Sequence, residues 1–140
     1  MRIFPDANIL VSVLNKEYPL YSYSSRIVSL ADHKNFEALT SPLCLAIAFY
    51  FAEKKNRKTA REKIKLLDGH LLIAGISEIT VRKVTKDSAI GDFEDGLEYY
   101  AALESKCECI ITEFVKDFYF SNIEIISGEG FFEKYLTSRR

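Results

Sequence analysis

The sequence predicts a three-layer α/β/α fold around a parallel sheet of four to five strands. Three observations predict it: short apolar runs recur along the 140 residues, helical patterns separate them, and 48% hydrophobic with 28% charged residues is typical of a globular protein. The length suits one domain, which we expect to span residues 1–140. Proline and glycine are few and scattered, so no linker is expected to divide it.

Five short runs are expected to form strands. The first, at residues 2–5 (RIFP), ends abruptly at Asp6. The others are expected at residues 37–41, 78–80, 108–112 and 123–126. Three of these runs are rich in isoleucine, which is expected of strands covered on both faces.

Helical patterns lie between and after these runs. Ser41 and Pro42 have the pattern of an N-cap followed by proline in the first helical turn. Apolar residues at spacings of three and four predict further helices at residues 22–32, 59–72, 92–105 and 128–136. The terminal Arg139 and Arg140 are expected to form a frayed tail.

Charge and hydropathy exclude several classes of protein. Nineteen basic and twenty acidic residues give a net charge of −1, so no global basic field indicates a nucleic-acid binder. No apolar stretch approaches the ~20 residues that span a bilayer, and no signal peptide is expected, so we predict a cytoplasmic protein without membrane contact. Reduced thiols are expected for the three cysteines, because Cys107 and Cys109 supply only two of the four ligands of a structural zinc.

Acidic and polar residues gather at two strand ends. Asp6 and Asn8 follow the first predicted strand. The others flank the fourth predicted strand, either leading the helix before it or directly following it: Asp92, Glu94, Asp95, Thr112, Glu113 and Asp117. Ligands bind doubly wound sheets at the carboxyl ends of strands, so we expect these two groups to converge.

Converging carboxylates repel one another unless a cation lies among them. Their hard oxygens suit Mg²⁺ or Mn²⁺, and phosphodiester hydrolysis is the chemistry of such a site. Structural roles are open for each acid: Asp6 as a helix N-cap, Asp92 and Glu94 as acids at a helix N-terminus, and Asp117 in a turn.

Three segments together resemble PIN domains. Residues 3–10 (IFPDANIL) resemble their opening strand and D-x-N turn, and residues 92–103 (DFEDGLEYYAAL) resemble the "DFEDAL…AAAL" helix of bacterial members. Residues 111–118 (ITEFVKDF) resemble their "ITRNxKDF" segment, and residues 123–136 resemble their last strand and helix.

The resemblance implies an α/β/α fold and metal-dependent ribonuclease activity of the VapC toxin type, with Mg²⁺ or Mn²⁺ as the metal. It implies RNA as the substrate, a small antitoxin protein as a partner, and a homodimer. Carried onto this sequence, Asp6, Asp95 and Asp117 become the catalytic, metal-binding acids. Asn8 and Thr112 become polar supports, and Asp92 and Glu113 lie beside them.

The sequence departs from the family pattern at two positions. The family usually has a glutamate where residues 41–47 (SPLCLAI) end in Ile47, and the next acid on that helix, Glu53, lies about 240° around the axis. The asparagine or aspartate expected after the fourth strand is replaced by Phe114. A catalytically impaired module that binds RNA or protein is therefore the alternative to an active nuclease.

Two further features leave alternatives open. Lys54, Lys55, Arg57 and Lys58 can contact the phosphates of RNA or form an ordinary solvated surface. Asp6 could also be the nucleophile of an aspartyl phosphotransferase, but haloacid-dehalogenase-type phosphatases need a second acid two residues on, where this chain has Asn8.

Overall fold

Five parallel strands form one sheet in the computed structural model, which describes residues 1–137. The strands are β1 (Arg2–Pro5), β2 (Glu37–Thr40), β3 (Leu72–Ile73), β4 (Cys109–Ile111) and β5 (Glu124–Ile126). They lie in the order β3-β2-β1-β4-β5, and all four neighbouring pairs are parallel. The predicted α/β fold with a parallel sheet is confirmed.

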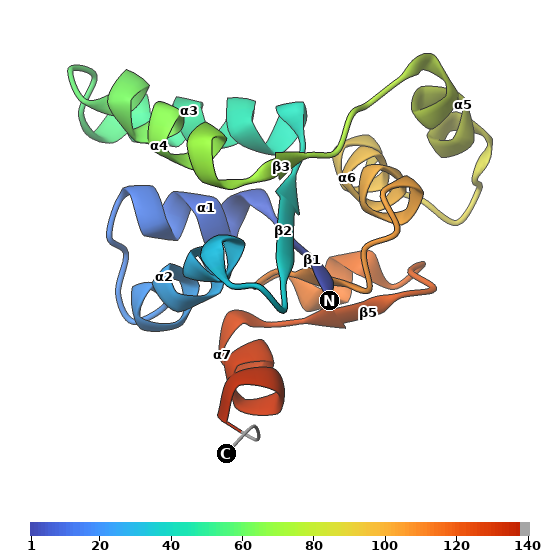
Figure 1. Cartoon of the computed structure of the whole chain (residues 1–140). Coiled ribbons are helices and arrows are strands. Elements are labelled where there is room, and N and C mark those ends of the chain that lie inside the picture. Colours follow the sequence, from blue (N-terminus) through green and yellow to red (C-terminus); the bar gives the residue numbers. More distant parts are fainter. Residues whose placement is uncertain (138–140) are drawn as a thin grey trace.

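Helices cover both faces of the sheet. They are α1 (Ala7–Leu14), α2 (Tyr21–Ser29), α3 (Pro42–Lys55), α4 (Ala60–His70), α5 (Glu78–Lys86), α6 (Phe93–Glu104) and α7 (Gly128–Phe131), with 3₁₀ turns η1 (Leu30–Asp32) and η2 (Val115–Phe118) and a π-helical turn η3 (Phe132–Thr137). Figure 1 shows α1 to α4 on one side of the sheet and α5 and α6 on the other. Right-handed crossovers require this division, since the chain moves outward from β1 to β3 and then returns past β1 to β4.

The central strands are buried on both faces. Ile3 and Phe4 of β1 and Ile110 and Ile111 of β4 are fully buried, which accounts for their continuous apolar sequences. A side-chain cap fixes the beginning of α3 beside these strands. The Ser41 hydroxyl accepts a hydrogen bond from the Cys44 amide at 3.1 Å, and Pro42 follows as predicted.

The strand predicted at residues 78–80 is wrong. Glu78 begins α5, because the Ser77 hydroxyl accepts from the Thr80 amide while the Thr80 hydroxyl accepts from the Ser77 amide, forming a capping box. The third strand is instead Leu72–Ile73, and α4 ends at His70 before it. β-branched residues in this segment gave a strand signal that the cap and the packing of α5 on α6 override.

Three smaller findings bear on the sequence predictions. Cys44, Cys107 and Cys109 are buried free thiols. Within residues 1–137, no helix has both the length and the hydropathy to cross a bilayer. The predicted tail at Arg139 and Arg140 lies outside the described residues.

The order in which consecutive strands are added to the sheet reverses at β1, which has β2 on one side and β4 on the other. Hydrogen bonds continue beyond the strand ends: the Asp6 amide donates to the Ile111 carbonyl and the Thr112 amide donates to the Ile126 carbonyl, both at 2.9 Å. Asp6 and Thr112 therefore lie side by side at the carboxyl edge of the sheet. This point, where the order of strands reverses, is where open α/β sheets bind ligands.

Candidate functional site

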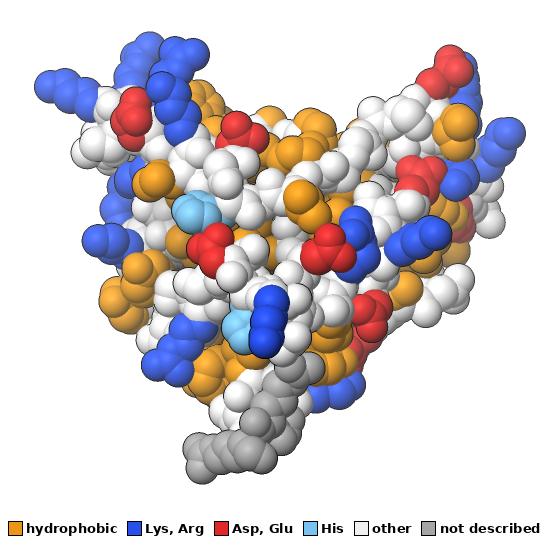
Figure 2. Space-filling view, viewed as in Figure 1, with side chains coloured by type: hydrophobic (Ala, Val, Ile, Leu, Met, Phe, Trp, Pro, Cys, Tyr) orange, Lys and Arg blue, Asp and Glu red, His pale blue; other side chains and the backbone are white. Residues whose placement is uncertain are grey.

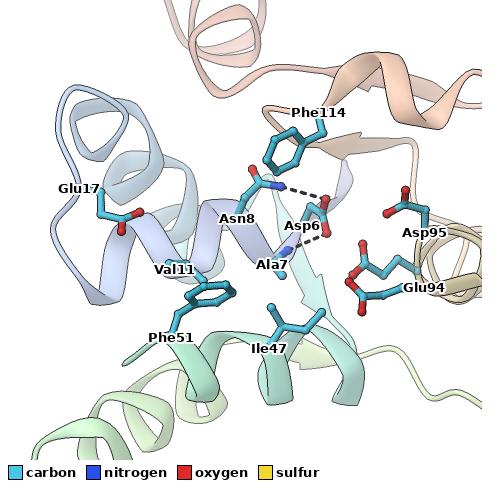
Figure 3. A pocket seen from close by; sticks show the side chains of 11 residues that line it. Asp6, Ala7, Asn8, Val11, Glu17, Ile47, Phe51, Glu94, Asp95 and Phe114 are labelled. Carbon is cyan, nitrogen blue, oxygen red and sulfur yellow. Dashed lines mark hydrogen bonds between the residues drawn. The ribbon is translucent and has the colours of Figure 1, made fainter. Parts of the chain in front are cut away.

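A cleft of about 340 Å³ opens at the carboxyl ends of β1 and β4. Residues of α1, α3, α6 and the segment after β4 line it: Asp6, Ala7, Asn8, Val11, Glu17, Ile47, Phe51, Glu94, Asp95, Glu98 and Phe114. Figure 3 shows Glu94 and Asp95 reaching toward Asp6 from α6, with the Ile47 and Phe114 side chains on either side of Asp6. The predicted convergence of acids from two distant parts of the sequence is thus present for Asp6 and Asp95.

Asp6 is held by hydrogen bonds to both of its carboxylate oxygens. One oxygen accepts from the Ala7 amide at 2.7 Å, which makes Asp6 the N-cap of α1. The other accepts from the Asn8 amide group at 3.0 Å and from the Thr112 hydroxyl at 2.9 Å. Asp6 is therefore both a helix cap and a fixed carboxylate on the floor of the cleft.

Asn8 and Thr112 connect Asp6 to the segment after β4. The Asn8 amide group also donates to the Thr112 hydroxyl at 2.9 Å, and the Asn8 carbonyl accepts from the Glu113 amide at 2.9 Å. The Phe114 amide donates to the Thr112 hydroxyl at 3.1 Å. These bonds use most of the polar groups of Asn8 and Thr112, so both side chains have one orientation relative to Asp6.

The acids at the beginning of α6 differ in their surroundings. Asp92 is the N-cap, and its carboxylate accepts from the Asp95 amide at 2.9 Å. Burial, followed by the nearby charges of Asp92, Asp6 and Asp117, raises the pKa of Asp95 to about 7. Burial and the charges of Asp92 and Asp6 also raise the pKa of Glu94. These carboxylates lie close enough together to disfavour one another's ionisation.

Glu98 is a further acid in the cleft, and it was missed by the sequence analysis. Its side chain is only 2% exposed. Burial raises its pKa to about 11, with contributions from a hydrogen bond to Asp6 and the charges of Asp6 and Asp95. A signal was present in the sequence, because Glu98 follows Asp95 by three residues and shares its helix face.

Cys44 joins this buried group from α3. One ligand atom each from Asp6, Cys44 and Glu98 lie within 4.8 Å of one another, and all three residues are buried. Burial and the charges of Glu98 and Asp6 raise the pKa of the Cys44 thiol well above its ordinary value. Cys44 is distant from both acids in the sequence, and the fold brings it beside Asp6 at the end of β1 and Glu98 of α6.

Asp117 lies in an adjoining hollow of about 320 Å³. The residues that line this hollow are Gly91, Asp92, Asp95, Lys116, Asp117 and Tyr119. Asp95 therefore faces both hollows, and the charge of Asp117 contributes to its raised pKa. The structure brings Asp117 to the edge of the site and not among the residues that line the larger cleft.

The two positions that depart from the family pattern both line the cleft. Ile47 is half-buried and presents hydrocarbon from α3, and the Phe114 ring is 59% exposed over the opening. Glu113, in contrast, accepts from the Gly128 amide at 2.9 Å at the beginning of α7. Its carboxylate is thus bound to the end of another helix, away from the cleft.

The predicted basic residues lie beyond the cleft at the end of α3. Lys54 and Lys55 form its last turn, and Arg57 and Lys58 follow in the exposed connection to α4. The Lys54 ammonium lies 5.1 Å from the centre of the Tyr50 ring, and Lys55 donates to the Asn15 carbonyl. Figure 2 shows lysine and arginine side chains projecting over this connection, at the upper left. Since Phe51 of the same helix lines the cleft, the basic residues begin one turn from it.

The cleft is chemically a set of hard oxygen donors with an apolar rim. Asp6, Glu17, Glu94, Asp95 and Glu98 contribute carboxylates, and among residues 1–137 no lysine or arginine lines it. Crowded buried carboxylates are stabilised in their charged form by a cation. Oxygen ligands of this kind fit a divalent cation, and Asp6 and Asp95 both line the cleft.

Comparison with solved structures shows the same fold in VapC-type proteins. The chain is similar to a chain of VapBC2 from Rickettsia felis, solved bound to a promoter DNA fragment, with a TM-score of 0.70 and 21% identity over 91% of this chain and 98% of that one. It is also similar to a chain of VapBC-1 from nontypeable Haemophilus influenzae, with a TM-score of 0.64 and 20% identity over 92% and 99%. A third is the sarcin-ricin loop cleaving toxin VapC20 of Mycobacterium tuberculosis, with a TM-score of 0.62 and 12% identity over 77% and 86%.

A search of curated protein sequences gave no match. The sequence profile of the PIN domain, in contrast, matches residues 2–115, which include β1, all of α6 and the end of β4. That range holds every residue that lines the cleft. The chain belongs to the PIN domain family.

Proposed function

We propose that this protein is a metal-dependent ribonuclease that hydrolyses RNA phosphodiester bonds in the cleft at the ends of β1 and β4. The observation that carries the proposal is the convergence of Asp6 and Asp95, which are about ninety residues apart in the sequence, in a cleft lined by acids and by no basic residue of the described chain. Similarity to a toxin named for cleaving the sarcin-ricin loop supports RNA as the substrate class.

Asp6 and Asp95 would hold Mg²⁺ or Mn²⁺, with Asp117 as a further acid beside Asp95. A bound divalent cation activates water and neutralises the charge that develops on the phosphate. Asn8 and Thr112 orient the Asp6 carboxylate through their hydrogen bonds. Outside the cleft, Lys54, Lys55, Arg57 and Lys58 are placed to contact RNA phosphates.

Cleavage of a panel of single-stranded RNAs in Mn²⁺ tests the proposal. Asp6→Asn and Asp95→Asn each remove one carboxylate, and asparagine keeps the N-cap that Asp6 provides. We expect cleavage to fall by at least about 100-fold in both. Even the loss of a residue that only hydrogen-bonds a metal ligand reduces activity about 10–100-fold. Asp68→Asn, at an exposed position of α4, is the matched control and should cleave like the wild type. Equal cleavage by Asp6→Asn and wild type would contradict the proposal.

A binding module without catalysis is the second candidate function. Ile47 and Phe114 favour it, because both place hydrocarbon in the cleft at positions where the family pattern has polar residues. This function predicts RNA or protein binding that is equally strong in Mn²⁺ and in EDTA, without cleavage of any RNA in the panel. A binding experiment in both buffers separates the two functions.

We also propose a small antitoxin protein as a partner and a homodimer as the assembled state. Support for the antitoxin comes from the VapBC structures among the similar folds. Light scattering of the purified chain measures the dimer directly. Co-expression with the product of an adjacent short reading frame, followed by affinity purification, tests for the antitoxin.

A further inference from the structure

The Glu98 carboxylate is buried without full hydrogen bonding. Its side chain is 2% exposed, and its Oε2 atom has no hydrogen-bond partner among the described residues. The other buried residues of α6, namely Gly96, Tyr99, Ala101 and Ala102, carry no carboxylate. A polar atom buried without a partner is destabilising by about 1–3 kcal/mol, more when charged, so it calls for an explanation beyond packing.

The position of Glu98 supplies that explanation. Its carboxylate lies within 4.8 Å of ligand atoms of Asp6 and Cys44, and it lines the same cleft as Asp95. Because Asp95 and Glu98 are one helical turn apart, α6 presents two carboxylates to the side of the cleft where Asp6 lies. The Glu98 and Asp6 carboxylates therefore lie close together, and Asp95 lines the same cleft one helical turn from Glu98.

The opposite wall offers no acid. Within the cleft, α3 contributes the hydrocarbon side chains of Ile47 and Phe51. Glu53, the acid nearest to Ile47 along α3, is exposed and is not among the residues that line the cleft. Glu17, the remaining acid that lines the cleft, lies away from Asp6 in Figure 3, so the acids beside Asp6 come from α6.

We propose that Glu98 is a ligand of the divalent cation in the cleft, together with Asp6 and Asp95, and that it supplies from α6 the carboxylate that α3 lacks at Ile47. This inference rests on the proposed metal-dependent function. In this arrangement the cation would take its carboxylate ligands from Asp6 at the end of β1 and from Asp95 and Glu98 on α6. The Cys44 thiol is a soft donor and stays outside the oxygen ligand set of Mg²⁺ or Mn²⁺.

Binding of Mn²⁺ alone to the full chain, measured by calorimetry and by the loss of the free-Mn²⁺ electron paramagnetic resonance signal, tests the inference without any RNA. Glu98→Gln should weaken Mn²⁺ binding by at least about 10-fold, because losing even a residue that only hydrogen-bonds a metal ligand weakens metal binding by that factor. Glu53→Gln makes the same chemical change at an exposed site and should bind Mn²⁺ like the wild type. Glu98→Met, which keeps the side-chain length without the charge, is the second variant. Circular dichroism establishes which variants fold.

Moving the carboxylate across the cleft gives a rescue. Ile47→Glu combined with Glu98→Gln should bind Mn²⁺ at least about 10-fold more tightly than Glu98→Gln alone, because the acid returns from the opposite wall. Wild-type affinity in a folded Glu98→Gln or Glu98→Met protein overturns the inference and leaves the proposed function standing. Absence of Mn²⁺ binding in the wild type itself overturns the proposed function, and the inference with it.

Discussion

The Thr112 hydroxyl donates a 2.9 Å hydrogen bond to the Asp6 carboxylate, although 106 residues separate the two in the sequence. Both residues directly follow parallel strands that are neighbours in the sheet, so the β1–β4 ladder sets the distance between them. The same hydroxyl accepts from the Phe114 amide and the Asn8 side chain. A single hydroxyl thus links the carboxylate, the turn after β1 and the segment after β4.

Thr112→Val should lower both Mn²⁺ affinity and stability. Removing the hydroxyl leaves buried partners unsatisfied, which is expected to lower the free energy of unfolding by about 1–3 kcal/mol. The freed Asp6 carboxylate should bind Mn²⁺ about 10–100-fold more weakly. Calorimetry and urea denaturation measure the two effects, and Thr112→Ser, which keeps the hydroxyl, should stay near the wild type. A valine variant with wild-type Mn²⁺ affinity would show that Thr112 does not position Asp6.

Glu104 should make stability depend on pH in the acid range. Burial opposes its ionisation, but hydrogen bonds from Lys83 at 2.9 Å and Thr80 at 2.7 Å and the charge of Lys83 outweigh burial and lower its pKa below the ordinary 4.5. A carboxylate with a lowered pKa stabilises the folded state above its unfolded pKa, and that contribution is lost as pH falls from about 4.5 through the folded value.

Glu104→Gln should therefore be less stable than the wild type at pH 7, and the difference should shrink below about pH 4.5. Urea denaturation across this pH range measures it. Glu62→Gln, which removes an exposed carboxylate paired with Lys65 at 3.6 Å, is the control and should change stability little at any pH. A difference between Glu104→Gln and wild type that is constant with pH would rule out this linkage.

Gly96→Ala should destabilise the contact between α5 and α6. A Cβ atom there would lie 2.7 Å from Val84 and 2.8 Å from Ile90, closer than side chains approach. The overlap should lower the free energy of unfolding by about 1–3 kcal/mol, in spite of the better helix propensity of alanine. Gly69→Ala provides the contrast, since nothing lies within 4 Å of a Cβ in α4. Urea denaturation should show opposite signs for the two variants, with Gly69→Ala stabilising by up to about 1 kcal/mol.

Lys54→Gln and Arg57→Gln should weaken RNA binding without altering which sequences bind. Each lost phosphate contact should reduce the slope of log K against log salt by about 0.7 for a single strand. The measurement is a salt titration of RNA binding in the Asp6→Asn background, where cleavage does not interfere. Arg82→Gln, an exposed site on α5 on the other side of the sheet, is the control. Unchanged slopes in Lys54→Gln and Arg57→Gln would place the RNA elsewhere.

The sequence predicted the sheet and most helices because local signals and the tertiary structure agree there. The isoleucine-rich run of β4 is buried on both faces, and Ser41 with Pro42 begins α3 as their chemistry indicates. The error at residues 78–80 arose where the two disagree. Thr80 has a high strand propensity, but its hydroxyl accepts from the Ser77 amide in the capping box that begins α5.

The site was only partly predictable for a related reason. Asp6 and Asp95 stand at positions that strand ends and helix beginnings mark in the sequence. Glu98 is in the middle of a helix, and its spacing from Asp95 places it on the same helix face without showing that this face is buried. Its neighbours in the cleft, Asp6 at the end of β1 and Cys44 of α3, come from distant parts of the sequence.

The pairing of β1 with β4 also decides when the cleft can exist. A ribosome adding about 5–20 residues per second needs roughly 5–20 s to proceed from Asp6 to Thr112. For most of that interval the nascent chain carries Asp6 without Asp95 and Glu98, and β4, which fixes the distance from Asp6 to Thr112, is completed only at its end. The acidic site is therefore a late product of synthesis.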